Sequence, residues 1–294
     1  MSVVSHTPLS VSQNFLHDPT LVESLVQQSS IGSQDTVLEI GPGYGIITRV
    51  LCSHCRQVIA VEKDLRLAGM LRKQLQNIPN LALCNDDFLS HPLPEGAYKV
   101  FSNIPFHITS AILKRLTGAA NPPEDAYLVV QKEAAQVYTG GSTHTLRGVL
   151  LYPCFETAVT HRFQRVDFIP HPRVDVVLLH IHWRSQPLID HRSRQFYRDF
   201  VVYGFSTWNH TVEKTLRTLF SYHQLKQLRK RLGLSLDVPP GGLLPEAWLR
   251  IFDAFQQFGK PEMHWKISGN EARLLRQQKK LCKRHRTCVA HQSE

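Results

Sequence analysis

The first half of the chain alternates short apolar runs with amphipathic stretches of helical spacing. Several apolar runs lack polar alternation, which is typical of strands that are buried on both faces of a sheet. Amphipathic stretches such as residues 46–55 and 65–76 separate them. The predicted strands are residues 36–40, 57–62, 81–84, 98–103, 126–131 and 174–181. This order predicts an open, mostly parallel, doubly wound α/β sheet.

The later sequence changes character twice. Residues 155–181 are rich in strand formers and are broken only at residues 170–172, which predicts an antiparallel hairpin at one edge of the sheet. After residue 182 the apolar spacing becomes helical, with stop signals at glycines and prolines. The predicted helices are residues 194–205, 212–220, 224–232 and 245–258.

These changes divide the chain into three predicted parts. Residues 1–182 form the α/β domain, and residues 183–260 form a small all-α domain. Residues 261–294 form a basic tail, which we expect to be disordered or to become helical only when it binds a partner.

Charge is distributed unevenly along the 294 residues, which carry a formal net charge of +10. Residues 1–180 hold 14 basic and 15 acidic side chains, whereas residues 181–294 hold 20 basic and 9 acidic ones. This asymmetry predicts a catalytic or cofactor domain joined to a part that binds a polyanion, with nucleic acid favoured over a membrane surface. Neither a membrane span nor a signal peptide is recognisable, so we expect a cytoplasmic protein.

The six cysteines are too few for a disulfide scaffold, and we expect free thiols. Cys52 and Cys55 form a C-x-x-C without a second pair at zinc spacing, which favours ordinary thiols on a helix. The tail holds a run of ligand-type residues at three-residue spacing, namely Cys282, His285, Cys288 and His291. Because zinc fingers usually have a long loop between two ligand pairs, we expect no metal site.

One predicted strand leads directly into a glycine-rich turn that contains Gly41, Gly43 and Gly45 and opens a helix. Such a turn lets a ligand touch bare backbone at the carboxyl end of a strand. The third glycine of a dinucleotide fingerprint would fall at Ile46, and the Lys and Ser/Thr of a phosphate-binding loop are absent. Nicotinamide and flavin cofactors therefore fit this turn poorly.

The next two strands also end in polar groups. Glu62 ends the second strand, where a carboxylate of a nucleotide-binding fold accepts hydrogen bonds from ribose hydroxyls. The third strand ends at Asp86, Asp87 and Phe88, whose carboxylates and ring suit the exocyclic amine and flat face of an adenine. Any one of these acids taken alone could simply be a solvated side chain at a strand end. Because polar groups follow several successive strands at the same end of the sheet, we predict a nucleoside ligand there.

The fourth strand ends in Asn103, Ile104, Pro105 and Phe106. The Asn103 amide oxygen and the Ile104 carbonyl can accept hydrogen bonds from an adenine amine and so direct its lone pair towards an electrophile. Pro105 stiffens the turn, and Phe106 offers a face on which an extruded base can stack. We therefore assign these four residues as the predicted catalytic group.

Five ordered motifs resemble those of the rRNA adenine N6-methyltransferases that use S-adenosyl-L-methionine, and most of all the erythromycin-resistance (Erm) branch. They read SQNFL at residues 12–16, EIGPGYG at 39–45, AVEKD at 60–64, NDDF at 85–88 and NIPF at 103–106. The resemblance covers residues 12–181 and implies a Rossmann-like class I methyltransferase sheet. It also implies that the helical remainder is a small C-terminal RNA-binding domain.

The resemblance implies a role for each matching residue in cofactor binding. Asn14 and Leu16 would close over the cofactor, and the turn at Gly41 and Gly43 would approach its methionine part. Glu62 would hold the ribose.

At the next two strand ends, Asp87 would bind the cofactor's adenine amine, with Phe88 beside that ring, and the adjacent Asp86 could exchange roles with Asp87. Asn103 would serve both the cofactor and the target amine. The family usually has Tyr at Phe106, so stacking is retained here but a phenol hydrogen bond is lost.

Related groups differ at a few positions. The small-subunit rRNA adenine dimethyltransferases and their mitochondrial transcription-factor relatives typically have Gly before Gln in the first motif and Asn-Leu-Pro-Tyr in the fourth. Here Ser12 and Ile104 stand at those places and favour the Erm branch. A non-catalytic RNA-binding protein on the same scaffold would have lost a motif residue, and none is missing. DNA adenine methyltransferases usually have Pro after the Asn.

The predicted function is therefore N6-methylation, with one or two methyl groups, of a single adenine in a single-stranded loop of large-subunit 23S rRNA. In the Erm branch this confers macrolide–lincosamide–streptogramin B resistance. We expect a monomer that contacts rRNA phosphates through its basic back half. The candidate phosphate ligands are Lys214, Arg217, Lys226, Arg229, Lys230 and Arg231.

Overall fold

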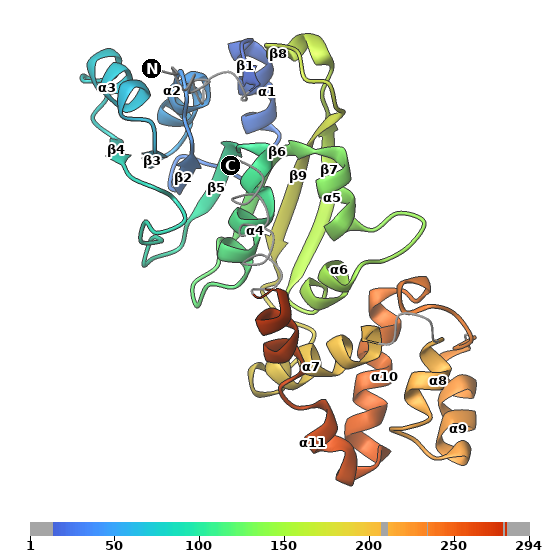
Figure 1. Cartoon of the computed structure of the whole chain (residues 1–294). Coiled ribbons are helices and arrows are strands. Elements are labelled where there is room, and N and C mark those ends of the chain that lie inside the picture. Colours follow the sequence, from blue (N-terminus) through green and yellow to red (C-terminus); the bar gives the residue numbers. More distant parts are fainter. Residues whose placement is uncertain (1–13, 207–210, 234, 279, 281–294) are drawn as a thin grey trace, which may run out of the picture. The chain divides into compact units, whose positions relative to one another are not determined.

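The computed structural model describes residues 14–206, 211–233, 235–278 and 280 (Figure 1). Contacts within the chain define two compact units. The first unit comprises Met1–Thr139 and Phe155–Ser185, and the second comprises Gly140–Cys154 and Gln186–Glu294. The segment at residues 140–154 therefore packs with the helical part, although the sequence placed it within residues 1–182.

A seven-stranded sheet forms the centre of the first unit, in the order β4-β3-β2-β5-β6-β9-β7 (Figure 1). Its strands are β2 (Thr36–Ile40), β3 (Gln57–Glu62), β4 (Leu81–Asn85), β5 (Lys99–Asn103), β6 (Asp125–Gln131), β7 (Phe155–Arg162) and β9 (Val176–Trp183). The five strands from β4 to β6 are parallel, β9 pairs antiparallel with β6, and β7 pairs antiparallel with β9. The predicted parallel sheet with an antiparallel edge hairpin is confirmed.

Helices of the first unit begin where local sequence favours them. The Asp18 carboxylate accepts from the Thr20 N–H and precedes Pro19 at the first turn of a helix, and Asp64 caps another helix in the same way. Their apolar faces pack on the sheet, where Val22, Val26 and other side chains are fully buried. These helices are α1 (Pro19–Gln27), α2 (Ile46–His54), α3 (Leu65–Gln74), α4 (Thr109–Thr117) and α5 (Lys132–Thr139).

The strand order reverses between β2 and β5, and this reversal creates the position for a site. Pairing between the two strands includes Leu38 and Val100, and beyond it the Ile40 N–H donates instead to the buried Ser102 hydroxyl at 2.8 Å. In open α/β sheets a crevice for ligands lies at such a reversal, outside the carboxyl ends of the strands.

A second, two-stranded sheet joins the start of the described chain to a distant segment. β1 (Phe15–Leu16) pairs antiparallel with β8 (Phe168–Ile169). Leu16 and Phe168 are buried in the same core as α1 and α2. Neither short strand shows a recognisable β pattern in the sequence, because two residues are too few for alternation.

The second unit is helical and surrounds an aromatic core. Trp248, Phe200, Phe252 and Phe255 are fully buried there, and a Cβ on Gly204 would lie 2.4 Å from the Trp248 ring. Its labelled helices are α6 (Leu146–Leu151), α7 (Arg194–Phe205), α8 (Val212–Leu216), α9 (Tyr222–Leu232), α10 (Pro245–Phe258) and α11 (His264–Ile267), and residues 270–278 are also helical. Short 3₁₀ turns in the two units occupy Phe106–Ile108, Arg165–Asp167, His191–Ser193, Pro240–Gly242 and Pro261–Met263.

The described part of the predicted tail is folded into the second unit, which corrects the expectation of disorder for these residues. Ile267 is fully buried, and the Asp199 carboxylate accepts from the backbone N–H groups of Gly269 and Glu271. Glu271 forms a two-point ion pair with Arg198, at 2.5 and 2.8 Å. The cysteine and histidine run from residue 282 to residue 291 lies outside the described residues.

The described cysteines are free thiols, as expected: Cys52, Cys55, Cys84 and Cys154. Burial raises the pKa of Cys52 to about 12 and that of Cys55 to about 11, so neither thiol of the C-x-x-C is reactive at neutral pH. Within the described ranges, no helix is both long enough and apolar enough to cross a membrane.

Candidate active site

The glycine-rich turn after β2 has a backbone that requires glycine. Gly41, Gly43 and Gly45 have φ values of 68°, 58° and 79°, in the left-handed region that other residues rarely adopt. A Cβ on Gly43 would lie 2.6 Å from Cε1 of Phe15 in β1. The turn therefore presents bare backbone, with the N-terminal strand packed directly against it.

Glu62, at the end of β3, faces this turn. One carboxylate oxygen accepts from the Gly43 N–H at 3.1 Å, and the other accepts from the Asp64 N–H at 2.8 Å. Only 7% of Glu62 is exposed, and this burial raises the pKa of its carboxyl group while the backbone hydrogen bonds oppose that rise. Glu62, the residue predicted to bind the ribose, is thus in direct contact with the predicted glycine turn.

The two acids after β4 have different partners. Asp87 forms a 2.8 Å ion pair with Lys63 and accepts from the Leu89 N–H, whereas Asp86 contacts His91 at 3.0 Å. The hydrogen bonds from Lys63 and from His91 lower the pKa of Asp87 and of Asp86, respectively. Both carboxylates are therefore ionised acceptors near neutral pH, and their relative roles in adenine binding stay a prediction.

Phe88 follows these acids and is buried at 4% exposure. The Arg115 guanidinium lies over its ring, 5.4 Å from the centroid. This cation–π contact covers one face of the ring, and the position of Phe88 beside the cofactor's adenine ring stays a prediction.

Asn103, at the end of β5, is oriented by the N-terminal segment. Its Nδ2 donates to the Asn14 backbone carbonyl at 2.7 Å, and the Asn14 side chain in turn donates to the Pro170 carbonyl at 2.7 Å. Because a carbonyl can only accept, the amide nitrogen of Asn103 must face Asn14. Oδ1 consequently points away from Asn14 and can accept a hydrogen bond from a ligand.

The residues after Asn103 form a tight corner. Ile104 is buried at 2% exposure, and Pro105 precedes the 3₁₀ turn that contains Phe106. A Cβ on Gly41 would lie 3.9 Å from the Pro105 ring, so the first and fourth motifs lie next to each other. Phe106 is partly buried against the core around α1 and α2.

The motif residues therefore lie together at the carboxyl ends of the parallel strands. Gly43 contacts Glu62 there, and Asn103 contacts Asn14. Sequence reasoning missed three supporting residues there. Lys63 pairs with Asp87, Ser102 ties β5 to β2, and Glu39 is buried in β2. A single acid in the otherwise apolar run VLEI was the available signal for Glu39.

Glu39 is 1% exposed, and its Oε2 has no hydrogen-bond partner within the described chain. Burial raises the pKa of its carboxyl group to about 8, and the nearby Glu62 acts in the same direction. Glu39 is thus mainly protonated at neutral pH. The carboxylate that the edge offers to a ligand next to the glycine turn is therefore Glu62.

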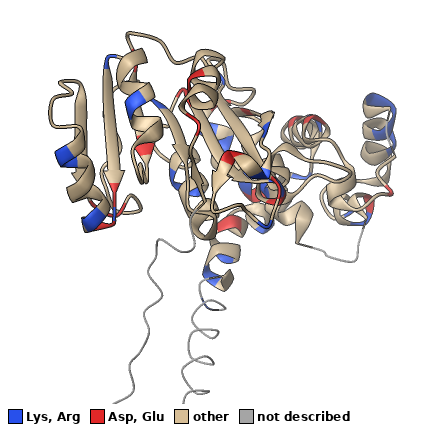
Figure 2. Cartoon of the chain, turned by 90° about the horizontal axis from the view of Figure 1, so that it is seen from above, with Lys and Arg blue, Asp and Glu red and all other residues tan. Residues whose placement is uncertain are grey.

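The predicted RNA-binding residues all lie in the second unit and are exposed. Lys214 lies in α8, Arg217 follows it, and Lys226, Arg229, Lys230 and Arg231 lie in α9, the helix with blue bands at the right of Figure 2.

Some of these cations already have partners within the protein. Arg217 and Arg229 both pair with Glu213, and Arg231 lies over the Phe258 ring at 5.2 Å. Lys214, Arg217 and Arg229 line a hollow of about 540 Å³.

Comparison with known proteins identifies the fold and chemistry at this edge. Residues 6–257 match the family described as ribosomal RNA adenine dimethylase. The chain belongs to this family. It is 30% identical in sequence to the 23S rRNA methyltransferase ErmE, whose crystal structure superimposes with a TM-score of 0.78 over 83% of this chain and 100% of that one.

Two curated relatives of this protein show the range of enzymes within the family. The rRNA adenine N-6-methyltransferase of Bacillus licheniformis is 28% identical over 247 residues, which is 84% of this chain and 86% of that protein. The ribosomal RNA small subunit methyltransferase A of Latilactobacillus sakei is 27% identical over 248 residues, covering 80% and 82%. The resemblance to rRNA adenine N6-methyltransferases and the class I methyltransferase fold are both confirmed.

This family member is an rRNA adenine N6-methyltransferase, and its cofactor is S-adenosyl-L-methionine. The edge of the sheet fits that group. The left-handed glycines leave room for close approach, Glu62 would accept from ribose hydroxyls, and Asp86 and Asp87 are ionised acceptors of the kind that an adenine amine requires. When bound, the cofactor supplies an electrophilic methyl group on a sulfonium.

Proposed function

We propose that this protein adds one or two methyl groups to N6 of a single adenine in a single-stranded loop of 23S rRNA, and that this confers macrolide–lincosamide–streptogramin B resistance. It acts as a monomer in the cytoplasm. The observation that carries the proposal is the orientation of Asn103, whose Nδ2 is engaged by the Asn14 carbonyl. The fourth motif can then offer Oδ1 to the amine of a target adenine.

The residues of the fourth motif position the target. Asn103 Oδ1 and the Ile104 carbonyl accept from the adenine amine, which directs its lone pair along the line of transfer. Phe106 stacks on the extruded base, an interaction worth about 1–3 kcal/mol. No strong base is required, because the amine becomes acidic as it is methylated and releases its proton to water or a carbonyl. Catalysis is therefore placement and electrostatic stabilisation.

The choice of the large subunit is supported by sequence identity and by two motif positions. ErmE is 30% identical to this chain, and the small-subunit enzyme of Latilactobacillus sakei is 27% identical. Ser12 and Ile104 also differ from the residues typical of the small-subunit enzymes, and both favour the Erm branch. The basic second unit would dock on phosphates around the loop through α8 and α9.

Three substrates offered in parallel test this proposal. The full-length protein is incubated with methyl-labelled cofactor and either naked 23S rRNA, assembled small subunits or duplex DNA, and the modified base is mapped. We expect label on one adenine of 23S rRNA. Label confined to small subunits would instead support the small-subunit dimethyltransferase function.

Cofactor binding measured alone distinguishes the enzymes from a non-catalytic RNA-binding protein. A dissociation constant is obtained by calorimetry for wild-type protein and for the Glu62→Ala variant. We expect measurable binding by the wild type and clear weakening in the variant. An absence of binding by the wild type would favour the scaffold function.

A further inference from the structure

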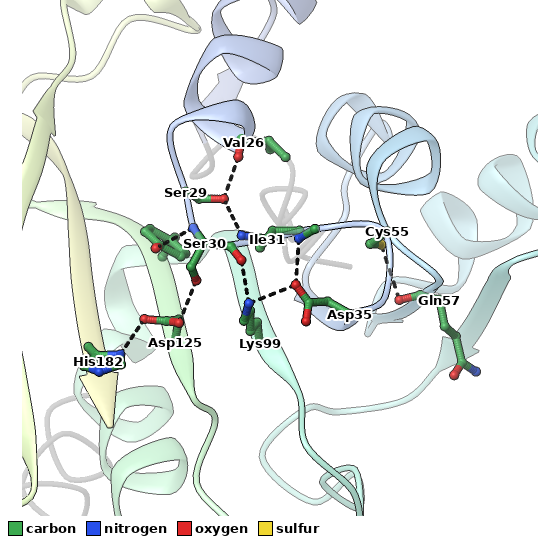
Figure 3. Close-up of polar contacts among 12 residues, drawn as sticks. Val26, Ser29, Ser30, Ile31, Asp35, Cys55, Gln57, Lys99, Asp125 and His182 are labelled. Atoms are coloured by element: carbon green, nitrogen blue, oxygen red, sulfur yellow. Dashed lines mark hydrogen bonds and ion pairs between the residues drawn. The ribbon is translucent and has the colours of Figure 1, made fainter. Parts of the chain in front are cut away.

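Three side chains with metal-binding atoms meet at the end of the sheet that lies opposite the methyl-transfer edge. Asp125 is the first residue of β6, which pairs antiparallel with β9. Asp125 lies opposite His182 of β9, and Tyr127 of β6 lies opposite His180. Because alternate residues of a strand share a face, this register places all four side chains on the same face. Figure 3 shows Asp125 between Ser30 and His182.

The metal-binding atoms are close together. Asp125 Oδ1 lies 2.7 Å from His180 Nε2 and 2.9 Å from His182 Nδ1, and the three atoms lie within 4.8 Å of one another. Asp125 is 5% exposed, whereas the side chains of His180 and His182 are 23% and 43% exposed. The group is therefore anchored on the protein side and accessible to an ion from solvent.

A second layer of contacts holds this group in place. The Ser30 hydroxyl donates to Asp125 Oδ2 at 2.6 Å, which leaves Oδ1 directed to the two imidazoles (Figure 3). The His180 ring stacks on Tyr127 with centroids 4.3 Å apart and an interplanar angle of 2°. The Tyr127 hydroxyl accepts from the Ser30 N–H at 2.9 Å. Such outer contacts orient ligands in metal sites.

We propose that Asp125, His180 and His182 form a binding site for a divalent transition-metal ion, with Zn²⁺ as the preferred occupant. Two imidazoles and one carboxylate are ligands that zinc accepts in tetrahedral sites, with water at the fourth position. Bonds of about 2.0–2.1 Å place neighbouring ligand atoms about 3.3 Å apart. The two separations from Asp125 Oδ1, 2.7 and 2.9 Å, would each open by about half an ångström, and the two imidazole nitrogens lie within 4.8 Å of each other.

The ion stabilises the fold and takes no part in methyl transfer. It connects β6 with β9 and, through Ser30, the turn that follows α1. The reacting groups lie at the carboxyl ends of the parallel strands, whereas Asp125 is the first residue of β6. The site is not apparent in the sequence, because 55 residues separate Asp125 from His180.

The test uses untagged full-length protein that has been stripped with a chelator. Zn²⁺ binding is measured by competition with a chromophoric chelator, and Co²⁺ absorption reports the coordination. The variant is His180→Gln with His182→Gln, and the matched control is His191→Gln with His223→Gln, two histidines of the second unit. Because wild type and both variants retain the tail residues Cys282–His291, any ion bound there cancels in the comparison.

We expect the His180/His182 variant to lose one equivalent of Zn²⁺, or to bind it at least about 100-fold more weakly, while the control matches the wild type. Ser30→Ala is expected to weaken binding about 10-fold, as removal of an outer contact does. Zn²⁺ should raise the melting temperature of the wild type but not of the variant. If the double variant does not fold, Asp125→Asn is measured in its place.

Equal stoichiometry and affinity in wild type and variant would overturn the proposal. So would an absence of Zn²⁺ binding by the wild type, in which case the group is a hydrogen-bonded network only. Cofactor binding by the variant, measured in the same preparation, shows that any loss of zinc is local.

Discussion

The side-chain amide of Asn103 donates a hydrogen bond to the backbone carbonyl of Asn14, 89 residues earlier in the chain, at 2.7 Å. The Asn14 side chain is itself held by the Pro170 carbonyl. The orientation of the central residue of the methyl-transfer motif thus depends on two segments that contribute no strand to the main sheet.

Replacement of Asn103 by Ala should nearly abolish methyl transfer, by at least about 100-fold, because the acceptor for the target amine is lost. Cofactor binding should weaken but remain measurable. Single-turnover transfer rates and calorimetric cofactor binding separate the two effects. Wild-type transfer by Asn103→Ala would refute the assignment of this residue.

Replacement of Asn14 by Ala keeps the carbonyl that accepts from Asn103 but removes the side-chain anchor to Pro170. The Asn103 amide should then sample other orientations, and we expect the transfer rate to fall about 10-fold or more. The melting temperature should change little. Gln27→Ala, at an exposed position of α1, is the matched control, and equal rates in both variants would contradict the anchoring role.

Gly43→Ala should be destabilising and should weaken cofactor binding. Its φ of 58° costs a non-glycine residue about 1–2 kcal/mol, and the added Cβ would lie 2.6 Å from the Phe15 ring. Gly96→Ala is a matched control, because a Cβ there meets no atom within 4 Å. Urea unfolding and cofactor titration of both variants check this prediction, which fails if the two behave alike.

Glu39→Gln should flatten the dependence of stability on pH. Burial raises the pKa of Glu39 to about 8 from 4.5, so the folded protein keeps a proton that the unfolded chain loses. The contribution of Glu39 to the free energy of unfolding is therefore complete below about pH 4.5 and is lost as the pH rises to about 8.

Urea unfolding of wild type and Glu39→Gln at pH 5, 6.5 and 8 measures this difference. The stability of the variant relative to the wild type should increase with pH. Glu95→Gln, at an exposed position, should follow the wild type throughout. A constant difference between wild type and Glu39→Gln would show that Glu39 is ionised.

Removal of both Lys226 and Lys230 should weaken rRNA binding and reduce its salt dependence. These exposed cations of α9 have no carboxylate partner among the described side chains, unlike Arg217 and Arg229, which share Glu213. Each lost phosphate contact should lower the slope of log K against log salt by about 0.7–0.9. Filter binding at several salt concentrations tests this, with Lys73→Ala in α3 as the control.

Shortening the chain should separate two roles of its C-terminal part. A chain ending at residue 280 loses Lys283, Arg284 and Arg286 and should bind rRNA less tightly. A chain ending at residue 260 also loses the buried Ile267 and the Glu271 partner of Arg198, so its melting temperature should fall. Equal melting temperatures would contradict the packing of Ile267.

Local sequence patterns were sufficient to predict the main sheet and the positions of the motifs, because each of these motifs follows a strand with a recognisable apolar run. They were insufficient where a contact joins distant segments. β1 and β8 are two residues long, and the role of Asn14 as an acceptor involves its backbone, which no residue type reveals. Residues 140–154 read as part of the first domain because neighbouring residues are strand-like, yet their apolar side chains pack on the helical core.

The pairing of β1 with β8 has a consequence for synthesis of the protein on the ribosome. Phe15 and Leu16 emerge early, but their partners at Ile169 and Phe168 emerge some 150 residues later. Until then the Asn14 side chain lacks its Pro170 acceptor, although the glycine turn and Asn103 have already been made. A nascent chain that carries every methyl-transfer motif is therefore expected to remain inactive until β8 has been translated.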